Sequence, residues 1–229
     1  MNKTFTAAIA IAATAGLTMA AVETKPAGYE EKSANDTQIL VCNPFLSFDG
    51  SATKLGDIDG SSIANGDYIA IIDASGHITE KYYWYDGSWN TKNDGTGESG
   101  NSVALNRGDG IQFSNANTSH PLLLSGIIDD NAASIQKSAS VGYTIVGNAA
   151  PVAKPLSAFS IIGNYDYNKD YVNHNGAKLI YKNSAWYFKD DGTSAATRQV
   201  AAGDGLFLYC AAGRRSGGAL NAKIVVPAQ

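Results

Sequence analysis

The chain contains few of the residues on which most metal-binding, redox and nucleic-acid-binding sites depend. Its 229 residues include three histidines, two cysteines and two methionines, and only 17% of them are charged. Acidic residues outnumber basic ones by 21 to 17, so the net charge is −4 and the isoelectric point is about 5.3. A chain with this charge lacks the basic surface by which proteins bind nucleic acids or anionic membranes. We therefore expect no nucleic-acid partner.

Motifs for catalysis or metal binding are also absent from the sequence. His77, His120 and His174 have no cysteine, histidine or carboxylate at metal-ligand spacing, and no serine lies in a nucleophile-elbow motif. We expect the three histidines to be isolated surface residues. No pair of acids lies in an evident cleft motif of a glycoside hydrolase. The sequence therefore predicts no catalytic residue, no metal and no cofactor, and we expect that the protein is not an enzyme.

The one long apolar run lies at the N-terminus and has the features of a secretory signal peptide. Lys3 precedes an uncharged run from Phe5 to Leu17, and Thr18-Met19-Ala20 places small residues at the −3 and −1 positions of a cleavage site. The run is shorter than the ~20 apolar residues that a membrane span needs. We predict a signal peptide over residues 1–20 and no transmembrane segment after its cleavage. The mature protein is then exported to the periplasm, the cell surface or the extracellular space.

Two copies of one stretch organise the rest of the chain. Trp89–Thr96 recurs as Trp186–Thr193, with Trp, Lys, Asp, Gly and Thr at a constant offset of 97 (186 − 89). A Gly-Asp-Gly turn follows each copy, at 108–110 and at 203–205. Because glycine recurs at both places, we expect the first or the second glycine of each turn to have positive φ. These ordered matches predict that one unit has been duplicated within the chain.

The composition favours strands and turns over helices. The chain has 24 glycines and 12 tyrosines, and its apolar runs are short, rich in β-branched and aromatic residues, and cut by Asp, Asn and Gly. We predict an all-β protein with two tandem, structurally similar antiparallel β modules, sandwich or barrel-like. After the signal peptide, the expected parts are a polar leader (21–37), module 1 (38–128), a linker (129–140) and module 2 (141–229).

Three motifs in each unit resemble a β module that recurs in secreted and surface proteins of Gram-negative bacteria. Its pattern is roughly LVGNPF, then an IY.W hairpin, then a GxGF strand. The first unit has ILVCNPF (39–45), YYWYDGSW (82–89) and GDGIQF (108–113), and the second has YTIVGN (143–148), LIYKNSAW (179–186) and GDGLFLY (203–209). The second copy lacks the proline after the asparagine, and Cys42 replaces the usual glycine. The resemblance implies an extracytoplasmic β module and no catalytic residue.

The two cysteines leave two alternatives open. Cys42 and Cys210 lie in different units, and neither is matched by a cysteine in the other copy. An exported protein meets an oxidising compartment, where the two can form a disulfide that bridges the units. In the other alternative both are buried thiols in strands, a common environment for cysteine. The sequence favours neither.

The predicted hairpin around Asp86-Gly87 carries the only cluster with functional promise. Asp-Gly between two aromatic runs is typical of a type I′ turn. Successive side chains of a strand face opposite sides, so some of the aromatic residues before the turn should face solvent and be able to stack on a sugar or anchor an interface. These candidate ligand-binding residues are Tyr82, Tyr83, Trp84 and Tyr85. The alternative is that they fill the core, as we expect of the recurring Trp89 and Trp186.

These features together predict a non-enzymatic exported protein of the cell surface or the extracellular matrix, which acts by protein interaction or assembly. The alternative is a carbohydrate-binding module that uses the aromatic hairpin, with Tyr83 or Trp84 in contact with the glycan. The candidate partners are therefore a surface glycan, another envelope protein or further copies of the same chain.

Overall fold

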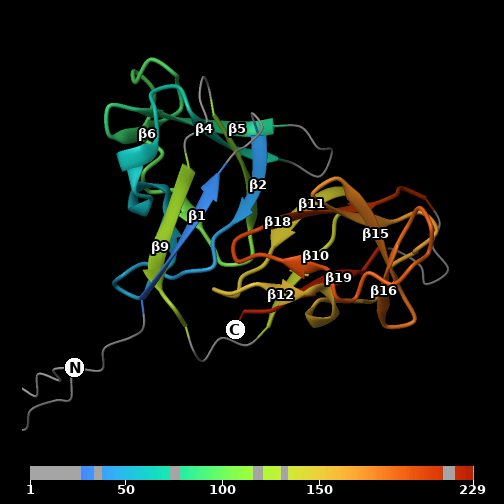
Figure 1. Ribbon diagram of the computed structural model, residues 1–229. Helices are drawn as coiled ribbons and strands as arrows, with labels where there is room; N and C mark the ends of the chain where they lie inside the picture. Colours follow the sequence, from blue (N-terminus) through green and yellow to red (C-terminus); the bar gives the residue numbers. More distant parts are fainter. Residues whose placement is uncertain are drawn as a thin grey trace, which may run out of the picture.

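The computed structural model describes residues 27–33, 38–72, 78–115, 121–129, 134–213 and 220–228, and this part of the chain is all-β (Figure 1). The expected fold class is therefore confirmed. The helical elements within these ranges are the short 3-10 turns η1 (Leu55–Asp57), η2 (Gly60–Ser62) and η3 (Leu156–Ala158). No helix in the described part has the length and apolar character that crossing a bilayer requires.

The N-terminal half, residues 27–129, is built on a five-stranded antiparallel sheet with the order β2-β8-β4-β5-β6. β3 and β7 form a separate two-stranded sheet. The bounds are β2 (Gln38–Cys42), β3 (Thr53–Lys54), β4 (Tyr68–Ile72), β5 (Ile78–Tyr85), β6 (Ser88–Asn90), β7 (Ala104–Leu105) and β8 (Gly110–Ser114).

The C-terminal half, residues 134–228, has a five-stranded sheet with the order β11-β18-β14-β15-β16 and a two-stranded sheet β12-β17. In both large sheets the first strand of the sheet lies at one edge, next to the last strand of that sheet, and the other three strands follow in chain order. This shared strand order is what a duplicated unit predicts. The bounds are β11 (Gly142–Gly147), β12 (Lys154–Pro155), β14 (Tyr171–His174), β15 (Ala177–Lys182), β16 (Ala185–Phe188), β17 (Gln199–Val200) and β18 (Gly205–Cys210). The division into separate domains stays a prediction.

A smaller sheet in each half includes part of the expected leader or linker. β1 (Ala27–Ser33) pairs along its length with β9 (Pro121–Ile127), and β10 (Ile135–Ser138) pairs with β19 (Lys223–Val226), which also pairs with β13 (Ser160–Ile162). The expected leader over 21–37 thus contains β1, and the expected linker over 129–140 contains β10. Both strands are polar segments ordered by backbone pairing with an apolar partner, and such pairing leaves little hydrophobic pattern in the strand itself.

Each half encloses its own buried cluster, centred on one of the recurring tryptophans. Trp89 is 0% exposed and Trp186 is 1% exposed, which confirms their expected core positions. Side chains alternate between the core and the outside along each strand, as Leu206 and Leu208 show in β18, where they are buried and Phe207 between them is not. The two clusters share no residue.

The two Gly-Asp-Gly turns use their glycines in two ways. Gly108 has φ +79° and Gly203 has φ +66°, so the first glycine of each turn has the expected left-handed conformation. The second glycine makes room for the other half. A Cβ built on Gly110 would lie 2.0 Å from Ile145 Cγ2, and one built on Gly205 would lie 2.6 Å from Leu40 Cβ.

The halves meet at the ends of β2 and β11, the edge strands of the two large sheets (Figure 1). Val41 of β2 forms an isolated antiparallel bridge with Asp204, and Val146 of β11 forms the same bridge with Asp109. Each aspartate is the middle residue of the other half's Gly-Asp-Gly turn. The junction therefore has approximate two-fold symmetry, as in a dimer whose subunits contact each other through the same surface.

Ion pairs across the junction follow the same symmetry. Lys32 of β1 contacts Asp204 at 2.9 Å, and Lys137 of β10 contacts Asp109 at 2.5 Å. Arg107 adds a buried contact that has no symmetric counterpart, because Ala202 takes the corresponding position (202 − 107 = 95). Its guanidinium donates to the carbonyl oxygens of Pro44, Ala149 and Ala228, and its Nη1 contacts Asp129 at 3.3 Å.

Candidate functional site

The expected aromatic hairpin, β5 and β6, divides its side chains between the core and the outer face of the sheet. Tyr82 is 8% exposed and belongs to the core, and its hydroxyl donates to Glu80 at 2.5 Å. Burial, together with this hydrogen bond, raises the pKa of Tyr82 to about 12. Trp84 packs edge-on against Trp89, with ring centroids 5.2 Å apart. Two of the four candidate binding residues thus point inward.

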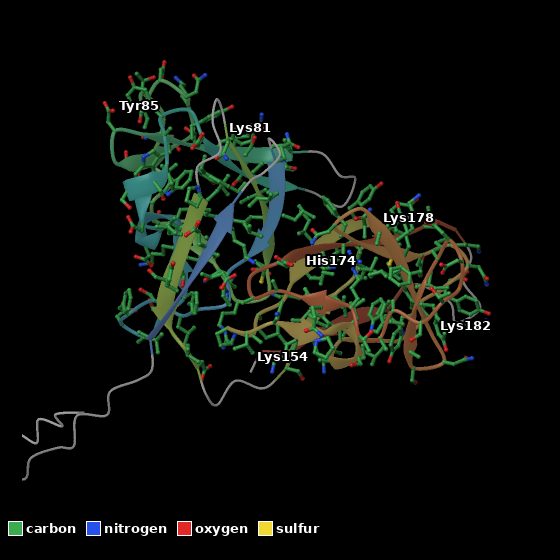
Figure 2. All side chains as sticks on the ribbon, in the orientation of Figure 1. Lys81, Tyr85, Lys154, His174, Lys178 and Lys182 are labelled. Atoms are coloured by element: carbon green, nitrogen blue, oxygen red, sulfur yellow. The ribbon has the colours of Figure 1, made fainter. Side chains whose placement is uncertain are left out.

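Tyr83 and Tyr85 lie on the outer face of the same sheet. Tyr83 packs against Tyr68 of the neighbouring strand, with ring centroids 5.5 Å apart, and Lys81 Nζ lies 4.5 Å from the centroid of the Tyr68 ring. Figure 2 shows Lys81 and Tyr85 at the end of the N-terminal half that is remote from the junction. Tyr85 leans on the Gly95 turn, where an added Cβ would meet its ring at 2.6 Å. The outward pair is therefore partly covered by its own half.

The C-terminal half presents a larger aromatic surface on the outer face of its own five-stranded sheet. Tyr143, Tyr209 and Tyr171 lie side by side on three neighbouring strands, because Tyr209 of β18 is the register partner of both Tyr143 and Tyr171. The ring centroids are 5.0 Å apart in both pairs. Their side chains face outward, since the neighbours Leu208 and Cys210 in β18 are fully buried. We call these three residues the tyrosine row.

Phe207 and two lysines extend the tyrosine row. The Phe207 ring lies 5.9 Å from that of Tyr143 in an edge-on contact. Lys178 Nζ and Lys189 Nζ lie 5.5 Å and 5.2 Å from the centroid of the Tyr171 ring, which is within the range of cation–π contacts. Burial, followed by the side-chain hydrogen bond with Tyr143, raises the pKa of Tyr171, so its hydroxyl is protonated at neutral pH.

The fold does not require the tyrosine row. In the N-terminal half the same register positions of β2, β8 and β4 hold Gln38, Ser114 and Tyr68. Two of the three aromatic rings are thus specific to the C-terminal half, although the strand order is the same. Sequence reasoning missed the row because its members come from distant strands. The alternation in GLFLY (205–209), which places Phe207 and Tyr209 on one face, was the signal that could have revealed it.

A hollow of about 260 Å³ lies at the end of the β15–β16 hairpin. Its lining is Ile180, Lys182, Asn183, Tyr187 and Gly192. Ile180 and Lys182 alternate with the inward-facing Leu179 and Tyr181, so they lie on the same face of β15 as Lys178. Figure 2 shows Lys178 and Lys182 on the β15 side of the C-terminal half. The row, the lysines and the hollow therefore belong to one outer surface.

His174 is buried, contrary to the expected surface position, and it lies near the junction of the halves (Figure 2). Its Nδ1 accepts from Arg198 Nε at 3.1 Å, so its other nitrogen, Nε2, carries the proton and lies 3.3 Å from Asp204. Its remaining side-chain neighbour is Asn175. No hydroxyl or thiol within the described residues is hydrogen-bonded to this ring. His77 and His120 lie outside the described residues.

Cysteine, histidine and acidic side chains form no second site among the described residues. Cys42 and Cys210 are both fully buried and are not joined in a disulfide. In the structure they are therefore buried thiols in strands. Burial raises the pKa of the Cys42 thiol to about 12, which keeps it protonated at neutral pH. No group of three or more histidine, cysteine or acidic side chains is placed to hold a metal ion in the part of the chain that the structure describes.

Comparisons with protein-family models, with curated proteins and with solved structures found no match to this chain. The resemblance to the Gram-negative surface module therefore stays a prediction, and the candidate site stands on its own geometry.

Proposed function

We propose that this chain is an exported, non-enzymatic binding protein that binds a glycan through the outer face of its C-terminal sheet. The observation that supports this proposal is the tyrosine row of Tyr143, Tyr209 and Tyr171, with ring centroids 5.0 Å apart across three strands. Tyrosine rings offer flat apolar faces for the C–H faces of a sugar and hydroxyls for its polar edge. Export is supported by the sequence features of residues 1–20, which lie outside the described residues.

A glycan fits this surface better than a protein partner does. Protein interfaces are enriched in aromatic residues and Arg at their centres but depleted in Lys. Here the lysines Lys178 and Lys189 lie directly over a ring of the tyrosine row. An ammonium group beside a ring suits a ligand that combines apolar faces with many oxygen atoms, as a polysaccharide does.

The absence of a catalytic role is supported by the chemistry of the same surface. The five strands of this sheet contain no aspartate or glutamate, so they offer no pair of carboxylates of the kind used by glycoside hydrolases. His174, the one buried imidazole described, has both ring nitrogens engaged by Arg198 and Asp204. This chemistry fits a surface that holds a ligand better than one that transforms it.

The proposal is tested by exchanging the tyrosine row for the residues that the N-terminal half uses. Tyr143→Gln with Tyr209→Ser copies Gln38 and Ser114 from the same register positions. If each ring contributes about 1 kcal/mol of stacking, the double variant should bind about thirtyfold more weakly. The measurement is affinity electrophoresis and titration calorimetry of the mature protein against a panel of neutral and acidic polysaccharides.

The matched control is Tyr83→Ala, which removes an outward tyrosine from the other sheet and should leave affinity unchanged. Circular dichroism and thermal unfolding of each variant establish that the fold is retained. A wild-type protein that binds no polysaccharide of the panel would overturn the proposal. So would a folded Tyr143→Gln, Tyr209→Ser variant that binds as tightly as the wild type.

A further inference from the structure

We propose that the ligand of the tyrosine row is an acidic polysaccharide, whose carboxylate groups contact Lys178, Lys189 and Lys182 while its sugar rings lie on the tyrosines. This inference rests on the proposed glycan-binding function and adds the charge class of the glycan.

The first argument is that these cations have no carboxylate partner. At the junction, Lys32 and Lys137 each form an ion pair with an aspartate. Among the described residues, no carboxylate lies within ion-pair distance of Lys178, Lys182 or Lys189. Each of the three ammonium groups contacts one aromatic ring, and Lys189 Nζ also donates to the backbone oxygen of Asp170 at 3.5 Å. Lysines that have no paired carboxylate among the described residues are available to an anionic ligand.

The second argument is the charge balance of the surface. The chain as a whole carries a net charge of −4. The strands of this sheet carry only lysines among charged residues, Lys178 and Lys182, and Lys189 directly follows β16. Asp170 directly precedes β14 but is fully buried, and it accepts hydrogen bonds from Asp166 N and Ala211 N. Asp204 directly precedes β18 and pairs with Lys32 at the junction. Asp190 and Asp191 lie in the turn beyond Lys189, where Asp191 accepts hydrogen bonds from Thr193. The outer face is therefore cationic on an acidic protein.

The third argument is that the lysines are fixed in position. Lys189 N donates to Lys178 O at 2.8 Å, which holds the two residues next to each other across the strands. Both ammonium groups lie about equally far from the Tyr171 ring, at 5.2 Å and 5.5 Å. Lys182 lies over another ring, that of Tyr167, at 4.8 Å. Ring contacts restrict these long side chains, which lowers the entropy lost when a ligand binds.

The fourth argument concerns the length of the ligand. Lys178 and Lys182 are four residues apart on one strand, which corresponds to about 13 Å. That distance exceeds a single sugar ring, so both lysines are reached only by an oligosaccharide stretch. The hollow of about 260 Å³ beside Lys182 is smaller than the about 300–1,000 Å³ of sites that enclose a whole small molecule. It accommodates part of a longer chain, such as one acidic sugar unit.

The experiment compares oligogalacturonates of defined length with the same oligosaccharides after reduction of their carboxyl groups, using the full mature protein and titration calorimetry. The wild type should bind the acidic form about tenfold more tightly than the reduced form, and raising the salt from about 0.05 to 0.5 M should remove the difference. Lys178→Gln with Lys189→Gln should lose that tenfold preference, so that the variant binds the acidic and the reduced form with the same affinity.

The control is Lys154→Gln, which removes a lysine of β12 away from this surface (Figure 2). It should bind both forms as the wild type does. Equal wild-type affinity for acidic and reduced oligosaccharides, with binding still lost in Tyr143→Gln, Tyr209→Ser, would overturn the charge inference and leave the proposed function intact. Absence of binding to either form, and to the wider polysaccharide panel, would overturn both.

Discussion

Cys42 of β2 lies against Gly147 of β11, and each is the register partner of the last glycine of its own half's Gly-Asp-Gly turn, Gly110 and Gly205. A Cβ built on Gly147 would lie 2.2 Å from Cys42 Cβ and 3.1 Å from its Sγ. The offset between them, 105 (147 − 42), equals that between Leu40 and Ile145, the two side chains that cover the opposite half's glycines. Residues on the two-fold axis contact the residue at the matching position of the other half. The side chain of Cys42 therefore leaves room only for the hydrogen atom of a glycine at position 147.

The position of Cys42 leads to a prediction about thiol chemistry. Burial raises the pKa of Cys42 to about 12, and Cys210 is fully buried as well. Since the thiolate is the reactive form, neither cysteine should be alkylated by iodoacetamide at pH 8 while the protein is folded. In urea without reductant, both should be alkylated. Peptide mass spectrometry measures the modification, and unmodified cysteines that become alkylated only after reduction would show a disulfide instead.

A second prediction concerns the fit of Ile145 over Gly110. Gly110→Ala places a methyl group 2.0 Å from Ile145 Cγ2 and should destabilise the protein by about 1–3 kcal/mol. Combining it with Ile145→Ala removes Cγ2, the nearest obstructing atom, so the double variant should be more stable than the sum of the two single losses predicts. The free energies of unfolding from urea titrations give the coupling.

Gly192→Ala is the matched control for this cycle. Gly192 has φ +69° but no atom within 4 Å of an added Cβ, so alanine there should cost only the backbone strain of about 1 kcal/mol. It should also show no coupling to Ile145→Ala. Additive losses for Gly110→Ala and Ile145→Ala would contradict the close packing at the junction.

Local signals in the sequence predict the strands and hairpins well. The Asp86-Gly87 turn has φ of +44° and +88°, and the matching turn at Asn183-Ser184 has φ of +50° and +61°. Each turn needs positive φ at two adjacent residues, and short polar residues or glycine tolerate it. The strands that flank these turns were predicted for the same reason.

Contacts between distant strands were not predictable in the same way. Tyr143, Tyr171 and Tyr209 are far apart in sequence and meet only through the register of three strands. Lys32 belongs to a polar segment whose pairing with β9 depends on the tertiary structure. Local patterning determines where a strand lies, whereas the neighbours of its outward side chains depend on the strand order of the whole sheet.

The indole nitrogens of the two core tryptophans give a third prediction. Trp186 Nε1 donates to Phe159 O at 2.9 Å, whereas Trp89 Nε1 is buried and has no hydrogen-bond acceptor within the described residues. Trp186→Phe leaves the carbonyl oxygen of Phe159 without its hydrogen-bond donor. Trp89→Phe removes an N–H group that has no acceptor among the described residues. Trp186→Phe should therefore destabilise the protein by about 1–2 kcal/mol more than Trp89→Phe. Thermal unfolding of both variants tests this, and equal losses would contradict it.

The last prediction concerns the acid stability conferred by Asp204. Burial by itself raises the pKa of this carboxyl, but the hydrogen bond from His174 and the charge of Lys32 outweigh it, and the net pKa lies below its ordinary value of 3.8. A carboxyl whose pKa is lower in the folded than in the unfolded state binds protons less readily when folded. Its stabilising contribution is therefore complete well above pH 3.8 and is lost as the pH falls through the folded-state value.

Asp204→Asn keeps the shape of the side chain and removes this titration. At pH 7 the variant should be less stable by about 1.5–3 kcal/mol, because a charge-assisted hydrogen-bond network at the junction is lost. Below pH 4 the difference between wild type and variant should shrink, since the wild-type carboxyl is becoming protonated. Urea titrations from pH 7 to pH 2.5 measure both curves, with the exposed Asp190→Asn as the control that should follow the wild type at every pH. A wild-type advantage that persists unchanged to pH 2.5 would show that the contribution of Asp204 does not depend on its charge.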